Sequence, residues 1–367
     1  PVICTVMGFS FVMKITTCDR HLVESISGVI TRSKFILIPL ATLLTWWINI
    51  AIPSAAGCAA AVGSILIPAL IAAGVHPAMA AAAVLAGTWG SAISPGTSHN
   101  PFVADLAGTD VMSVIMNEAP AAIIASFVCI IALTAISVIR NEGPSDDRRQ
   151  AYLAELSEEE QNRTFKINPI YALIPLVPLV MLVLGSKQIA ILPLTDVPTA
   201  MITGSILALI ATRTNPQEVT KKFFDGMGSA YGSVMGLIVA AGVFTAGMAA
   251  MGLTGALIEA MKGSESVAKF AGAFGPFLIA VISGSGDAAA LAFNGAITPQ
   301  AEAFGMSIVD LGSLAQMAGA IGRSMSPVAG AAMVCAGLAK VSPMEISKRN
   351  AIPMLLATIT FMIALFI

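Results

Sequence analysis

Charged side chains are scarce in this chain of 367 residues: Asp, Glu, Lys and Arg make up 11 % of it, whereas 56 % of the residues are hydrophobic. A soluble domain of this length carries about a quarter charged residues, so this sequence has too little polar surface for a soluble fold. The formal net charge is −2 and no basic patch is present, which excludes a nucleic-acid partner. Long apolar runs with few charges instead indicate a membrane protein, in contact with a lipid bilayer.

Paired cysteines and metal motifs are also lacking. The five cysteines, which show no CxxC or other metal-ligand spacing, are Cys4, Cys18, Cys58, Cys129 and Cys335. We interpret them as buried thiols, and expect no metal site and no cofactor. No charged region or cleavage signature precedes the apolar run that starts at Val2, so we expect no signal peptide. Because the chain opens at Pro1 inside that run, we expect the natural protein to begin earlier.

The sequence does contain apolar runs that are hydrophobic enough for a membrane. Four breaks interrupt these runs, two in each half. They are Pro53 to Gly57 and Gly90 to Ser98 in the first half, and Ser283 to Asp287 and Gly322 to Pro327 in the second. Small, polar and helix-breaking residues at membrane depth free backbone groups that lipid cannot satisfy, so they lie inside protein or along a wet cavity. Paired breaks in two halves of a chain are typical of the binding site of a secondary transporter.

A charged segment separates the two halves. Residues 142–167 are crowded with charge and lack an apolar run, so we interpret them as a linker outside the membrane. The basic residues of the linker favour the cytoplasm under the positive-inside rule. The predicted organisation is a first repeat at 1–141, incomplete at its N-terminus, then the cytoplasmic linker, then a second repeat at 168–367.

Short apolar segments meet at two of the breaks. Segments 34–52 and 58–74 meet at the first break, and segments 269–284 and 286–300 meet at the third. Several of them are shorter than the roughly 20 residues that a spanning helix needs. Each pair therefore predicts a re-entrant helical hairpin, with a single kinked helix as the alternative. The other two breaks predict one broken transmembrane helix in each half.

The two halves also agree in spacing. Pro68 precedes Pro95 by 27 residues, and Pro299 precedes Pro327 by 28. The six residues that end at Pro95 and Pro327, GSAISP and GRSMSP, agree at Gly, Ser and Pro without a gap. The predicted fold is thus an all-α polytopic membrane protein built from two repeats. Whether the repeats are inverted depends on the number of spans in each half, which the sequence leaves open; a cytoplasmic linker with an odd number of spans in each half would invert them.

The breaks carry the chemistry of an anion site. A helix that restarts near the bilayer centre presents free N–H groups and a partial positive charge of about +0.5, which bind anions. Hydroxyls can donate to a carboxylate or accept from a cation, and glycine lets backbone approach a ligand. For each serine alone, ordinary helix packing is the alternative. The predicted substrate-binding residues are Ser54, Ala55, Gly57, Ser94, Gly96, Thr97, Ser283, Gly284, Ser285, Gly286, Arg323, Ser324 and Ser326.

Two ionisable residues stand inside these breaks. Arg323 needs a partner at membrane depth, and a substrate carboxylate in bidentate geometry is a natural one; the alternative is a fixed pair with Asp287 or Asp310. Asp287, together with the hydroxyls of Ser54 and Ser285, is the candidate cation-coupling site. Transfer of a proton and pairing with Arg323 are alternative roles for Asp287. The sequence leaves open whether sodium or a proton is the coupling ion.

Two further pairs of residues have competing interpretations. His99 and Asn100 follow the second break and can reach a ligand, or can serve in a capping or surface role. Trp46 and Trp47 come late in an apolar run, where anchoring at the membrane interface is the commoner use.

Three stretches of the sequence resemble the DcuC-type anaerobic C4-dicarboxylate carriers: PSAAGCAAAVGSILIPALIAAGV, SGSGDAAALAFNGAITPQAEAFGM and GRSMSPVAGAAMVCAGLAKVSPMEISKRNAIP. The charged central linker lies where that family has one. The resemblance implies uptake, exchange or efflux of succinate, fumarate or malate across a bacterial inner membrane. It also implies inverted repeats, a homodimer, and a transport domain that moves like an elevator against a scaffold.

The expected function is therefore secondary active transport of C4-dicarboxylates, by exchange or coupled to a cation. One alternative is a carrier of another organic anion, such as citrate, gluconate or an amino-acid derivative. An intramembrane enzyme using Ser285 or Ser54 with His99 is a weaker alternative, because no GxSxG or HExxH motif is present. A channel is a further alternative.

Overall fold

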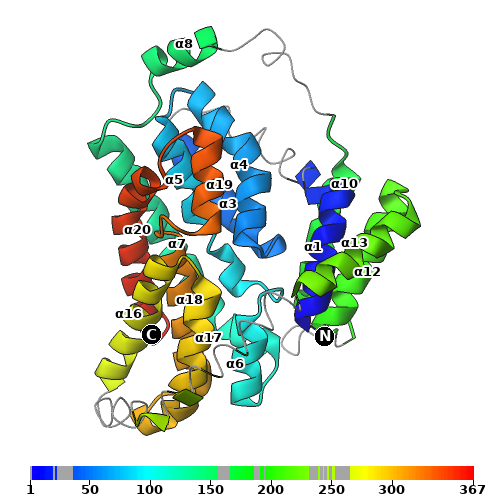
Figure 1. The fold of residues 1–367 in the computed structure, drawn as a ribbon, viewed down its shortest axis with the longest axis vertical. Coiled ribbons are helices and arrows are strands. Elements are labelled where there is room, and N and C mark those ends of the chain that lie inside the picture. Colours follow the sequence, from blue (N-terminus) through cyan, green and yellow to red (C-terminus); the bar gives the residue numbers. More distant parts are fainter. Residues whose placement is uncertain are drawn as a thin grey trace.

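The protein is all-helical. Its computed structural model describes residues 2–19, 21–22, 36–155, 166–185, 191–193, 195–230, 239, 243, 246–247, 250–252 and 265–367. Within these residues every regular element is a helix and no strand occurs, which confirms the predicted all-α class. Figure 1 shows a larger bundle, which contains the helices on either side of all four predicted breaks, and a smaller bundle beside it.

The larger bundle consists of α3 (Leu37–Ala51), α4 (Ala55–Ala72), α5 (Pro77–Gly87), η3 (Gly90–Ile93), α6 (His99–Ala107), α7 (Val111–Ile139), α16 (Glu265–Ser283), α17 (Gly286–Ala296), η6 (Thr298–Phe304), α18 (Ile308–Arg323), α19 (Gly330–Ala339) and α20 (Pro343–Ala364). Side-chain oxygens cap several of these helices where they begin. Asp110 accepts from the Ser113 N–H at the start of α7, and Ser307 accepts from the Asp310 N–H at the start of α18. Such caps satisfy N–H groups that have no partner within the helix.

The smaller bundle joins the two halves of the chain. It consists of α1 (Val2–Ile15), α10 (Pro169–Leu173), η4 (Ile174–Leu176), α11 (Val177–Leu184), α12 (Val197–Thr212) and α13 (Pro216–Ala230). Helix α1 packs against both α12 and α13, as Figure 1 shows. The α1–α13 contact is close because Gly226 has no side chain: a Cβ atom there would lie 2.4 Å from the Met7 carbonyl oxygen.

Helices end at all four predicted breaks. Helix α3 ends at Ala51 and α4 begins at Ala55, while α16 ends at Ser283 and α17 begins at Gly286. Helix α5 gives way to the short η3 before α6 begins at His99. Helix α18 ends at Arg323, and six residues separate it from the start of α19 at Gly330. Gly, Ser and Pro in these segments therefore interrupt helices, as the sequence predicts.

Packing contacts follow the same scheme in the two halves. Helix α3 packs against α5 as α16 packs against α18, and α4 packs against α5 as α17 packs against α18. Across the halves, α4 contacts α19 and α17 contacts α6. The long helices α7 and α20 pack against each other, and each contacts the other half through α18 or α5.

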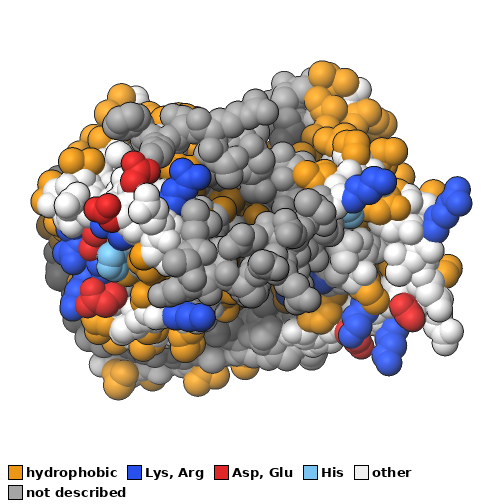
Figure 2. All heavy atoms as spheres, turned by 90° about the horizontal axis from the view of Figure 1, so that it is seen from above, with side chains coloured by type: hydrophobic (Ala, Val, Ile, Leu, Met, Phe, Trp, Pro, Cys, Tyr) orange, Lys and Arg blue, Asp and Glu red, His pale blue; other side chains and the backbone are white. Residues whose placement is uncertain are grey.

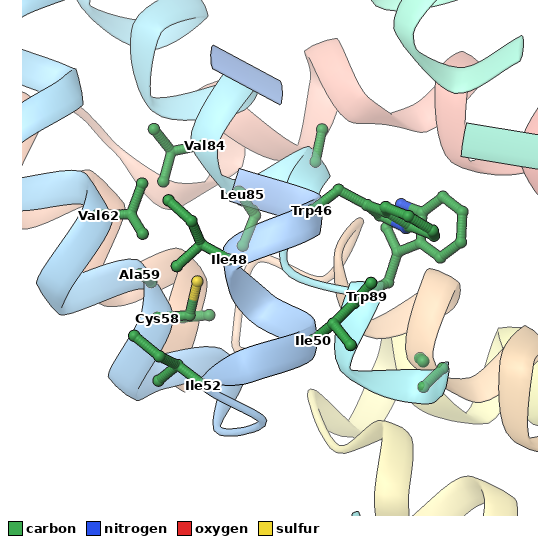
Figure 3. Packing of buried hydrophobic residues seen from close by; sticks show 14 of the residues in the cluster. Trp46, Ile48, Ile50, Ile52, Cys58, Ala59, Val62, Val84, Leu85 and Trp89 are labelled. Carbon is green, nitrogen blue, oxygen red and sulfur yellow. The ribbon is translucent and has the colours of Figure 1, made fainter. Parts of the chain in front are cut away.

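The core of the larger bundle is lined by small and aromatic residues. Every residue of α5 from Ala78 to Gly87 is buried. Trp46 of α3 is only 2 % exposed and stacks edge-to-face on Trp89, with ring centroids 5.6 Å apart; both lie within the packed cluster that Figure 3 shows. The interpretation of Trp46 as an interface anchor is wrong, because α3 turns this face toward α5. Trp47 points outward and is 53 % exposed.

Two of the described helices are long and apolar enough to cross a membrane: α7 and α16. Helix α4 is a third candidate if its two parts, Ala55–Gly63 and Ile65–Ala72, which are bent by 43°, count as one span. The outer face of α7 exposes large apolar side chains, including Ile131 and Ile139. Exposed apolar faces of this kind suit contact with lipid, as expected of a membrane protein.

The first part of the linker folds onto the larger bundle. Helix α8 (Asp146–Glu155) follows α7, and residues 156–165 of the predicted linker lie outside the described residues. Arg148 donates from Nε to the Gly74 carbonyl oxygen at 2.9 Å, and it also bonds to the carbonyl oxygens of Asn141 and Gly143. Figure 2 views the molecule from the α8 side and shows acidic and basic side chains interleaved there.

On this linker side, four charged residues form what we call the Arg349 ion cluster: Arg140, Glu142, Glu345 and Arg349. Arg349 donates to both carboxylate oxygens of Glu142, at 2.7 and 2.5 Å, and to Glu345 Oε2 at 2.9 Å. Arg140 Nε adds a hydrogen bond to Glu142 at 3.2 Å. Burial alone would raise the pKa of Glu142, but the hydrogen bonds from Arg349 and Arg140 outweigh it and hold the pKa below its usual value.

Candidate functional site

The four breaks surround one cavity of about 360 Å³. Its walls come from the tips of α3–α4 and α16–α17, from the segment between η3 and α6, from the end of α18 and from the start of α19. Met7 of the smaller bundle closes part of the wall. The lining residues are Met7, Pro53, Ser54, Ala55, Ala56, Ser91, Gly96, Thr97, Ser98, His99, Gly284, Ser285, Gly286, Asp287, Ala320, Arg323, Gly330 and Ala331.

The two tips have matching local structures. Ser54 caps α4 by accepting from the Gly57 N–H at 3.1 Å, and Ser285 caps α17 by accepting from the Ala288 N–H, also at 3.1 Å. Gly284 has φ +76°, and a Cβ atom there would lie 2.9 Å from the backbone of Val328 and Ala329. Only glycine suits such a turn in such close contact, so the tip of α16–α17 rests directly on the chain that leads into α19.

Four helix N-termini meet at the cavity. The first residues of α4, α6, α17 and α19 all belong to its lining. Each N-terminus presents N–H groups without an acceptor inside its helix and carries a partial charge of about +0.5. The cavity is therefore electropositive before any side chain is counted.

Arg323 is the last residue of α18 and lines the cavity. Its Nη2 donates to the Thr88 carbonyl oxygen at 2.7 Å, whereas its buried Nη1 has no hydrogen-bond partner. Among the described residues it forms no ion pair with a carboxylate. Asp310 bonds instead to Asn117 and Ser307, at 3.1 and 2.7 Å. Arg323 thus keeps an unused donor beside a cavity.

His99 and Asp287 approach each other across the cavity. His99 begins α6 and Asp287 lies in the first turn of α17, with 3.7 Å between His99 Nδ1 and Asp287 Oδ1. His99 is 2 % exposed, and neither ring nitrogen has a hydrogen-bond partner. The surface interpretation of His99 and Asn100 is wrong, because both are buried. The pair joins one residue from each half of the chain.

The structure brings together nine of the fourteen residues predicted to bind substrate or couple a cation at the cavity wall, and Asp287 is among them. Five predicted residues do not line it: Gly57, Ser94, Ser283, Ser324 and Ser326. They hold the breaks in shape instead. Ser324 shares a hydrogen bond with Thr88 at 3.3 Å, Ser326 accepts from the Val328 N–H, and Ser94 accepts from the Gly96 N–H.

Sequence reasoning missed several wall residues. Ser91 lies inside a break that the sequence identifies, so its position in that break is a usable signal. Gly330 and Ala331 come at the start of α19, and nothing in their composition distinguishes them from packing residues. Within the described residues, no group of three or more His, Cys, Asp or Glu side chains could hold a metal ion.

The apolar helical fold and this cavity are typical of a membrane carrier, and comparison with known proteins identifies the family. The family model for the C4-dicarboxylate anaerobic carrier, DcuC, matches residues 2–367. The chain therefore belongs to the DcuC family, which confirms the resemblance that the sequence motifs indicate. Membership of a carrier family also sets aside the interpretation as an intramembrane enzyme.

Proteins similar to this chain are known from several bacteria. An uncharacterized transporter of Haemophilus influenzae is 43 % identical over 272 residues, which are 73 % of this chain and 97 % of that protein. A "probable anaerobic C4-dicarboxylate transporter DcuC" of Vibrio cholerae is 27 % identical over 97 % of this chain and 79 % of its own length. The anaerobic C4-dicarboxylate transporter DcuC of Escherichia coli K12 is 32 % identical over 53 % of this chain and 44 % of its own.

Proposed function

We propose that this protein is a secondary active transporter that moves C4-dicarboxylates such as succinate, fumarate and malate across the bacterial inner membrane as a multi-pass protein. Transport proceeds by exchange or by coupling to a cation. The family and the names of the Vibrio and Escherichia relatives support this substrate class, and the bacterial sources support the location.

The observation that carries the proposal is the charge of the cavity. Four helix N-termini contribute roughly two positive charges between them. The guanidinium of Arg323 and the carboxylate of Asp287 cancel each other. The remainder matches the two negative charges of a dicarboxylate, which cannot be left bare in a low-dielectric site. The unpartnered Nη1 of Arg323 is a donor that a substrate carboxylate satisfies.

Coupling is the next part of the proposal. Asp287 lies in the first turn of α17, directly after the Ser285 cap, and Ser54 holds the equivalent cap on α4. These three oxygen-bearing side chains all line the cavity. We assign them to the coupling cation, which binds beside the substrate and offsets part of its charge. The short distance from Asp287 to His99 gives a proton an alternative route at the same place.

We propose an inverted-repeat architecture for the chain, with the repeats at 1–141 and 168–367 and re-entrant hairpins at α3–α4 and α16–α17. The corresponding contacts of α3 with α5 and of α16 with α18 support this architecture. The position of both hairpin tips at one cavity also supports it. By resemblance to the family, the protein acts as a homodimer with an elevator motion. The separation of the smaller bundle from the bundle that holds most of the cavity supports such a division.

Counterflow tests the proposed function. Proteoliposomes that contain the purified protein are loaded with unlabelled fumarate, and entry of labelled succinate is followed with and without a sodium gradient. Entry accelerated by internal fumarate is expected, and it also excludes a channel. Dependence on sodium would select symport over exchange. Absence of counterflow with either acid would contradict the substrate class; citrate and gluconate, loaded in the same way, then test the alternative of another organic anion.

A further inference from the structure

A buried acid lies outside the cavity, and the proposed mechanism does not use it. Glu118 sits seven residues into α7 and is 0 % exposed. Its Oε2 accepts a hydrogen bond from Gln316 Nε2 of α18 at 2.8 Å, and its Oε1 has no partner. The hydroxyl of Ser313, one turn earlier on α18, is also buried and has no hydrogen-bond partner. An isolated carboxylate in such a place carries a large desolvation penalty.

The hydrogen bonds around Gln316 have only one possible direction. Asn100 Nδ2 donates to the carbonyl oxygens of Ala92 and Ser94, at 2.7 and 2.9 Å, and to Thr97 Oγ1 at 3.1 Å. Since carbonyl oxygens only accept, the Asn100 amide is fixed with its oxygen facing α18. That oxygen accepts from Gln316 Nε2 at 2.6 Å. The Gln316 amide is therefore fixed as well, and its own oxygen is left without a donor.

Counting donors and acceptors shows what this network lacks. An ionised Glu118 only accepts, so Glu118 Oε1 and Gln316 Oε1 would be two buried acceptors with no donor except the Ser313 hydroxyl. A proton on Glu118 adds one donor to this group of acceptors and removes the buried charge at the same time.

Among the residues that the structure describes, no cation near Glu118 offers a substitute for that proton. Helices α3 and α5 and the η3 segment contain no ionisable side chain. The charged residues of α20 lie in its first two turns, next to Glu142. On α18, Arg323 bonds to Thr88, and Asp310 bonds to Asn117 and Ser307. On α6, His99 faces Asp287, and Asp105 is exposed.

We propose that Glu118 is the proton-binding site of this carrier, linked to the substrate cavity through Gln316 and Asn100. Asn100 holds the carbonyl oxygens of the η3–α6 break, and the neighbouring Thr97 and His99 line the cavity. The proton adds to a carboxylate oxygen of Glu118 and leaves it as H⁺; no other bond is made or broken. Glu118 is a positioning residue whose protonation sets the shape of the break. This inference rests on the proposed transport function.

Proton movement during transport tests the inference. Proteoliposomes with an entrapped pH dye receive succinate while the dye response and the entry of labelled succinate are recorded. In the wild type we expect acidification with uptake, and uptake several-fold faster when the outside is more acidic. Glu118→Gln, which mimics the protonated acid, should retain fumarate–succinate counterflow but lose the dye response and the pH dependence. Glu302→Gln, which changes an exposed acid of η6, should behave like the wild type.

The two hypotheses fail in different ways. Net succinate uptake without proton movement in the wild type, or wild-type proton movement in Glu118→Gln, would overturn the role of Glu118 but leave the transport function standing. No counterflow in the wild type would instead contradict the transport function. If Glu118→Gln does not fold, infrared spectra of the wild type between about pH 6 and 8 decide, because exposed carboxyl groups are ionised there. A carboxylic-acid carbonyl band that Gln316→Met shifts is expected; its absence overturns the proposal.

Discussion

Two arginines at helix ends in the larger bundle have opposite surroundings. Arg349, near the start of α20, is surrounded by carboxylates and donates to three carboxylate oxygens of Glu142 and Glu345. Arg323, at the end of α18, has one backbone carbonyl and a buried Nη1 without any partner. A charge that is fully paired inside the protein serves the fold. A charge that stays partly unpaired beside a cavity is available to a ligand. The hydrogen bond that it does not make contributes nothing to the stability of the protein while the cavity is empty.

Truncation of Arg323 should have the largest effect, and it tests the proposed difference between the two arginines most directly. We expect Arg323→Ala to lower succinate counterflow at low substrate concentration by about 100-fold or more, since loss of one partner of a desolvated charge pair costs about 2–5 kcal/mol or more. Arg323→Lys should also transport poorly, because it lacks the planar fork for a carboxylate. Initial rates and the melting temperature in detergent measure the two effects separately.

For this test the control is Lys221→Ala, which removes an exposed charge from α13 in the smaller bundle. The control should transport like the wild type, and all three variants should melt near the wild-type temperature. Full transport by Arg323→Ala would remove this residue from the substrate site.

The second test truncates the paired arginine. Arg349→Ala leaves Glu142 buried without its main partner, and loss of one member of a buried ion pair costs about 3–5 kcal/mol of stability. We expect a lower melting temperature and less folded protein, but an unchanged KM for succinate in the fraction that folds. Replacing both partners, Arg349→Met with Glu142→Leu, should recover most of the stability. An altered KM in Arg349→Ala would contradict the division between fold and site.

The third test uses pH. The folded-state pKa of Glu142 lies below its usual value of 4.5, so its contribution to stability is present above pH 4.5 and is lost as pH falls through the lowered pKa. The wild type should therefore lose melting temperature as the pH falls from about 5 toward 3. Glu142→Gln should start lower and lose less over the same range. Equal slopes for the two proteins would show that Glu142 is not the group responsible.

The sequence indicated where the site lies much better than which side chains face it. Gly, Ser and Pro inside apolar runs predicted all four helix breaks, because these residues oppose a continuous helix in any context. Which hydroxyl points inward depends on the turn that follows. Ser285 caps α17 at the cavity, while Ser324 turns back to Thr88 and Ser326 bonds to its own segment. Composition alone does not determine such directions.

The polar network behind the cavity was beyond sequence reasoning. Glu118 and Gln316 lie in mainly apolar helices, nearly 200 residues apart, and only the packing of α7 on α18 makes them partners. Trp46 gave a misleading signal for a related reason. Its place late in an apolar run suits a membrane interface, but contact with Trp89, which lies between α5 and η3, outweighs that preference.

The smallest effect we expect distinguishes two helix caps of the same chemistry. Ser285 caps α17 at the cavity, and Ser307 caps α18 at an exposed position. Alanine at either position should cost about 1 kcal/mol of stability, through loss of one bond to a first-turn N–H. Only Ser285→Ala should also raise the KM for succinate, by about fivefold, because about 1 kcal/mol of substrate binding is lost with the hydroxyl. Equal KM values in the two variants would mean that Ser285 serves the helix alone, and the α17 tip would then contact substrate through its backbone N–H groups only.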